Sequence, residues 1–158
     1  MSSQNGPPEL QCIANDLTEA CALLSANLVR VASGEAAPSP EINVEARLYA
    51  AAVVVWSIRN PDADVGANAD ALLDVWLANY LADLHSDDAA ALLRALDHRT
   101  PQYVVLWEAG GDWALNTARF LDVKMRTKAS PATLSALAAA AAAGREGIAK
   151  FIQAAFAV

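Results

Sequence analysis

Apolar residues recur at helical spacing along almost the whole chain, and the boundaries between these segments carry helix start signals. Three times a hydroxyl residue directly precedes a proline, at Ser39–Pro40, Thr100–Pro101 and Ser130–Pro131. A serine or threonine side chain can accept a free N–H of the first turn, and proline fits the first helical position because no N–H is needed there. Each pair therefore predicts the start of a helix.

The first predicted helix, from about Pro8 to Val31, carries apolar residues in two heptad columns. The columns are Leu10, Leu17, Leu24 and Val31, and Ala14, Cys21 and Leu28. A seam held over three heptads favours one arm of an antiparallel bundle, with an intermolecular coiled coil as the alternative. The helical wheel places Cys21 in this seam and Cys12 on the opposite side of the helix.

The second predicted helix, from Pro40 to Arg59, is polar only at its ends. Its middle, from Leu48 to Trp56, is apolar on every side. A helix without a polar face has to be surrounded by other helices. We therefore expect this helix at the centre of the fold.

Five further helices are expected. The first covers about residues 68–84, and the second starts at Ser86 as its cap. The others run from Thr100–Pro101 to the Gly110–Gly111 break, from Asp112 to about Lys128, and from Pro131 onward. We expect an interruption at Gly144, because a continuous last helix would place Arg145 within its apolar stripe. The alternative is a continuous helix with Arg145 buried against a carboxylate.

These elements predict an all-α fold, a single-domain bundle of six or seven helices with an apolar central helix. We expect a flexible tail over residues 1–8 and the helical domain over residues 9–158. No internal repeat and no β-strand is expected.

Composition and charge narrow the class of protein. Hydrophobic residues make up 55% of the chain. The formal net charge is −7, and this negative charge opposes binding to a nucleic-acid backbone. The longest apolar runs fall short of the roughly 20 residues of a membrane-spanning helix, and the first residues lack the features of a secretory signal. Two cysteines nine residues apart on one helix cannot pair with each other. We therefore expect a reduced, cytoplasmic protein.

The charges are unevenly distributed. Residues 60–93 contain seven acidic residues and no Lys or Arg, whereas residues 119–158 contain six basic residues and two acidic ones. Acidic residues stabilise helix N-termini and basic residues stabilise C-termini, which explains much of this pattern. The alternative is an acidic surface that binds a basic partner.

The sequence contains no signature of catalysis, metal binding or a cofactor. The two histidines, His85 and His98, have no ligand at metal-binding spacing, and no nucleophile motif or phosphate-binding glycine loop is present. The candidate partner- or ligand-binding residues are those beside the Gly-Gly break and in the last helix. They are Trp107, Asp112, Trp113, Arg145, Phe151 and Phe156.

We expect a non-catalytic protein–protein interaction module, an adaptor or regulator, that self-associates as a homodimer through the first or the last helix. The alternative is a small-molecule-binding protein or an enzyme with an aromatic-lined pocket between helices. The discriminating feature is the interior: an enclosed aromatic cavity with convergent polar groups supports the alternative, and a filled core with an apolar surface supports the interaction module.

Overall fold

The computed structural model describes residues 7–63 and 65–157 of the chain. In this part the protein is all-α, with no β-strand, which confirms the predicted fold class. The α-helices are α1 (Pro7–Ser33), α2 (Pro40–Arg59), α3 (Ala69–Leu81), α4 (Ser86–Glu108), α5 (Trp113–Met125) and α6 (Pro131–Ala155). Two short 3-10 helices, η2 (Pro61–Ala63) and η3 (Gly66–Asn68), connect α2 to α3.

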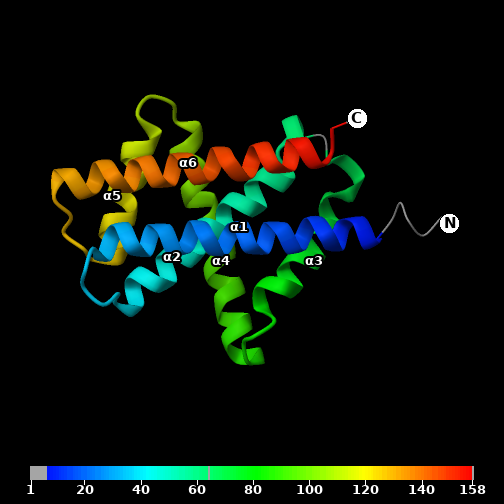
Figure 1. Ribbon diagram of the computed structural model, residues 1–158, viewed down its shortest axis with the longest axis horizontal. Helices are drawn as coiled ribbons and strands as arrows, with labels where there is room; N and C mark the ends of the chain where they lie inside the picture. Colours follow the sequence, from blue (N-terminus) through cyan, green and yellow to red (C-terminus); the bar gives the residue numbers. More distant parts are fainter. Residues whose placement is uncertain (1–6, 64, 158) are drawn as a thin grey trace.

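Helices α1 and α6 lie side by side and antiparallel across the molecule (Figure 1). Helix α2 packs beneath them and contacts each of the other five α-helices. Helices α3 and α4 meet at a turn that projects away from the α1–α6 layer, and they diverge from that turn toward the rest of the bundle (Figure 1). This arm forms the walls of the groove described below.

Helix α2 is the central helix, as its apolar sequence predicts. Every residue from Leu48 to Val54 is at most 1% exposed. Its N-terminus is capped by Ser39, whose hydroxyl oxygen accepts a hydrogen bond from the Ile42 N–H at 3.2 Å. The Ser39–Pro40 start signal is thereby confirmed.

The heptad seam of α1 is buried within the chain's own bundle. Its central positions, Ala14, Leu17, Cys21, Leu24 and Leu28, are between 0% and 6% exposed. The seam is therefore an arm of the bundle, and the intermolecular coiled coil on these residues is wrong. Burial of Cys21 and exposure of Cys12 confirm the predicted helical wheel.

The predicted helix start at Thr100–Pro101 is wrong, because α4 runs through it without a break. Leu96, Tyr103 and Trp107 recur at seven- and four-residue spacing and are at most 5% exposed. Burial of this stripe requires one continuous helix. The free energy gained from this burial outweighs the roughly 3 kcal/mol that an internal proline costs. The predicted Ser86 cap is also wrong, since the N-cap is His85, without a side-chain capping bond.

The predicted break at Gly144 is wrong as well, because α6 is continuous. A Cβ at Gly144 would lie 2.2 Å from Cδ1 of Leu24. Glycine at this position thus lets α1 and α6 approach each other closely. The break at Gly110–Gly111 is confirmed, and both glycines adopt positive φ angles there.

The boundary of the predicted tail is displaced, since α1 begins at Pro7 rather than after residue 8. The predicted flexibility of residues 1–6 falls outside the described residues. No helix in the described part of the chain is long and apolar enough to cross a lipid bilayer.

Candidate functional site

Three of the six predicted site residues, Trp107, Trp113 and Arg145, come together in space. The guanidinium carbon of Arg145 lies 4.1 Å from the centre of the Trp113 ring and 5.7 Å from that of Trp107. Trp56 of α2 completes the cluster at 4.8 Å. Among residues 9–63 and 65–157, no carboxylate lies within 4.0 Å of this guanidinium.

The Arg145 charge is therefore balanced by tryptophan faces, each such contact being worth about 0.5–2 kcal/mol. The alternative of Arg145 buried against a carboxylate is wrong. Because its three ring partners come from α2, α4 and α5, Arg145 links α6 to three other helices.

The neighbouring aromatic residues pack on one another rather than around an empty pocket. The Tyr49 ring centre lies 4.9 Å from that of Tyr103 and 5.8 Å from that of Trp107, and Phe120 lies 5.2 Å from Tyr103. The Tyr49 hydroxyl donates a hydrogen bond to the Ala141 carbonyl at 2.9 Å. These rings and this hydroxyl are part of the core, so the cluster supports the filled-core hypothesis over the aromatic pocket.

The other three predicted residues lie outside this cluster, in contacts that belong to a helix cap or to the hydrophobic core. Asp112 caps α5, its carboxylate accepting a hydrogen bond from the Leu115 N–H at 3.3 Å. Phe151 and Phe156 are half-buried near the end of α6 and pack against the hydrophobic core. None of the three joins the tryptophan–arginine cluster.

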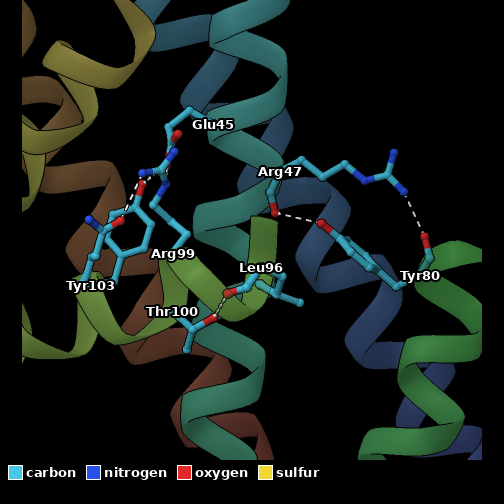
Figure 2. Close-up of polar contacts among 8 residues, drawn as sticks. Glu45, Arg47, Tyr80, Leu96, Arg99, Thr100 and Tyr103 are labelled. Carbon is cyan, nitrogen blue, oxygen red and sulfur yellow. Dashed lines mark hydrogen bonds and ion pairs between the residues drawn. The ribbon is translucent and has the colours of Figure 1, made fainter. Parts of the chain in front are cut away.

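A buried polar cluster connects α2 to α4 (Figure 2). The Glu45 carboxylate, 3% exposed, accepts a hydrogen bond from the Tyr103 hydroxyl at 2.5 Å and lies 3.0 Å from Nε of Arg99. Burial, together with the adjacent Glu45, raises the pKa of Tyr103 well above 10. A buried carboxylate is stable only when paired and hydrogen-bonded, as it is here. Sequence reasoning missed this cluster, because Glu45 lies more than 50 residues from Arg99 and Tyr103 in the chain and on a different helix.

No metal centre is formed in the described part of the chain, where no group of three or more His, Cys, Asp or Glu side chains converges. His85 and His98 are both exposed. His98 lies within α4 and not at a helix end, because α4 continues past Thr100.

The strongest candidate for a binding surface is a groove between α2, α3 and α4, which we call the α3–α4 groove. It has a volume of about 560 Å³. Its apolar lining includes Val55, Leu73, Leu77, Leu93, Leu96 and Pro101. Three of these side chains, Val55, Leu77 and Leu93, are only half-buried, so the groove presents an apolar floor to solvent.

The charged residues of the α3–α4 groove are mainly acidic. Asp70 and Asp74 come from α3, Asp97 comes from α4, and all three are exposed. Arg59 is the one basic residue of the lining among the residues that the structure describes, and it forms an ion pair with Asp70 at 3.5 Å. Both partners of this pair are largely exposed, so it contributes little to stability.

Sequence reasoning missed this groove as a site. The acidic run over residues 60–93 includes Asp70 and Asp74 of the groove, but helix-end electrostatics was the favoured explanation of the run. Asp97 lies outside that run, and only the tertiary packing of α3 and α4 places it in the same lining as Asp74. Asp83, in the same run, lines a different cavity, so the acidic residues do not form one patch.

Comparisons with protein-family models, with curated proteins and with solved structures each find no match for this chain. The function has to be argued from the geometry of its own residues.

Proposed function

We propose that the protein is a non-catalytic interaction module that binds a basic amphipathic helix of a partner protein in the α3–α4 groove. The observation that carries the proposal is an apolar floor flanked by Asp70, Asp74 and Asp97. Helix-in-groove binding uses an apolar helix face for affinity, and lysines or arginines beside that face would meet the acidic side chains. Helix α3 has thirteen residues, about 20 Å in length, which suits three to four turns of a bound helix.

Charge reversal in the groove is expected to weaken binding of a basic helix. The probe is a fluorescein-labelled amphipathic peptide of leucine and lysine, about fourteen residues or 21 Å long as a helix. We expect Asp74→Lys combined with Asp97→Lys to raise the Kd by about tenfold or more, because both steering and contact electrostatics are lost. Fluorescence anisotropy measures the Kd, and higher salt should raise it for the unmodified protein.

The matched control is Asp16→Lys combined with Glu19→Lys on α1, where both residues are exposed. It makes the same change in net charge away from the groove, so it separates a specific site from general attraction to an acidic protein. Equal loss of binding in the two double variants, or no binding of the peptide to the unmodified protein, would contradict the proposal.

A second surface supports self-association of the interaction module. Leu23 of α1 is 65% exposed and borders an apolar hollow of about 350 Å³ between α1 and α6, which we call the α1–α6 hollow. Small residues of α6, including Ala143 and Gly147, line it, and none of its lining residues in the described part of the chain is charged. A second copy of this net-negative chain avoids repulsion best at an uncharged surface. A protruding leucine beside a hollow on one face suits a two-fold contact, in which each copy supplies both parts.

We expect Leu23→Glu to convert a dimer into a folded monomer, because the new charge would be buried at the contact. Light scattering coupled to gel filtration should give twice 16.6 kDa for the unmodified protein and 16.6 kDa for the variant. The control is Val105→Glu on α4, since Val105 is 67% exposed and lies away from the hollow. A mass of 16.6 kDa for the unmodified protein at high concentration would remove the support for self-association.

A further inference from the structure

A second cavity lies between α1, the N-terminal half of α2 and the end of α3, and we call it the α1–α3 cavity. Its volume is about 620 Å³, within the range of small-molecule sites. The α1 side is mainly apolar and includes Cys21, Ala22, Ala26 and Val29. The facing side is polar and includes Asn43 and Arg47 of α2 and Asn79 of α3. The cavity is thus amphipathic.

Arg47 is held in place at this cavity by Tyr80 (Figure 2). The Arg47 guanidinium donates a hydrogen bond to the Tyr80 carbonyl at 2.8 Å, and its central carbon lies 4.7 Å from the Tyr80 ring centre. The Tyr80 hydroxyl in turn donates to the Arg47 carbonyl at 3.2 Å. A guanidinium carries five N–H donors, so this arrangement fixes its position while leaving donors for a ligand.

The charge of Arg47 has no carboxylate within 4.0 Å over residues 9–63 and 65–157. A second cation, Arg30, also lines the cavity, whose only carboxylate among the described residues is that of Asp83. Burial raises the pKa of the Cys21 thiol to about 12, so this side chain is neutral at pH 7. The cavity therefore has a local excess of positive charge in a protein whose net charge is −7.

We propose that the α1–α3 cavity binds a small amphipathic monocarboxylate. The ligand carboxylate would be held by Arg47, since a planar guanidinium matches carboxylate geometry. Its apolar body would lie along Ala22, Ala26 and Val29. This site is separate from the α3–α4 groove and does not depend on the function proposed for that groove.

Isothermal titration calorimetry with octanoate tests the proposal, with octanol as the neutral probe of the same length. We expect octanoate to bind at one site per chain and octanol to bind at least tenfold more weakly, because hydrogen bonds to charged groups are the stronger class. Arg47→Gln should weaken octanoate binding by at least tenfold. Asp83→Asn should strengthen it, because that variant removes the one carboxylate of the lining.

Two further variants keep the test decisive if Arg47→Gln also loosens the fold. Ala26 is exposed at the edge of the cavity, so Ala26→Trp should fill the cavity and abolish binding while the protein stays folded. Arg59→Gln removes an exposed arginine from the other groove and should leave octanoate affinity unchanged. Equal affinity for octanoate and octanol, unchanged octanoate binding by Ala26→Trp, or no octanoate binding to the unmodified protein would overturn the proposal.

Discussion

Replacing Glu45 with alanine is expected to lower the free energy of unfolding by about 3–5 kcal/mol, the usual cost of removing one partner of a buried ion pair. The substitution leaves the Arg99 guanidinium without its carboxylate partner. This loss is costly because the Arg99 side chain is only 17% exposed. It also removes the acceptor of the buried Tyr103 hydroxyl. Urea unfolding followed by circular dichroism measures the change.

The control for this prediction is Glu41→Ala, on the same helix at an exposed position, which should cost less than about 1 kcal/mol. A variant in which Glu45 and Arg99 become leucine and Tyr103 becomes phenylalanine should recover much of the loss, because it leaves none of these three positions with an unpaired buried polar group. A loss below about 1 kcal/mol for Glu45→Ala would show that water reaches Arg99 and Tyr103 in solution.

The second large effect is a loss of stability at alkaline pH. The folded Cys21 thiol has a pKa of about 12 because of burial, against 9.0 for an ordinary thiol. Between these values the unfolded chain has lost a proton that the folded chain retains. The free energy of unfolding therefore falls by about 1.4 kcal/mol per pH unit from this group as the pH rises above 9.

The buried tyrosines act in the same direction at higher pH. Burial raises the pKa values of Tyr49, Tyr80 and Tyr103 above the ordinary value of 10.0. Their contributions to stability are complete below pH 10 and are lost progressively above it. The decline should therefore steepen above pH 10.

Urea unfolding at several pH values from 8 to 11, with a reductant present, measures this decline. Cys21→Ala should remove most of the slope between pH 9 and pH 10, where the thiol acts largely alone. Cys12→Ala, which changes an exposed cysteine, should leave the slope unchanged. A stability that is independent of pH up to 11 would contradict the buried positions of these four groups.

The tryptophan–arginine cluster contains three of the residues that the sequence marked as candidates for binding. Trp107, Trp113 and Arg145 are residues that commonly anchor interfaces. In the structure the Arg145 guanidinium lies over the rings of Trp56, Trp107 and Trp113, and this contact joins four helices. The candidate surfaces for a protein partner are the α3–α4 groove and the α1–α6 hollow, and the α1–α3 cavity is the candidate site for a small ligand.

Local sequence signals determined most of the helices and the central position of α2. Ser39, Asp112 and Ser130 start helices by accepting a backbone N–H of the first turn, an interaction that involves only neighbours in the chain. The apolar middle of α2 and the heptad columns of α1 predicted burial because helical periodicity is also a local property. The same signals failed at Thr100–Pro101 and Gly144, where contacts with distant helices outweighed local propensity.

Only the tertiary structure decided which polar side chains meet. The pairs Glu45 with Arg99 and Arg47 with Tyr80 each join residues of different helices, and helical periodicity carries no information on how one helix is placed against another. Helix packing angles depend on many side-chain contacts made at once. The sequence by itself thus determined the all-α class, the buried faces and the net charge. The candidate sites follow from the divergence of α3 and α4, the close approach of α1 and α6 at Gly144, and the position of Arg47 beside Tyr80, each of which is set by packing between distant segments.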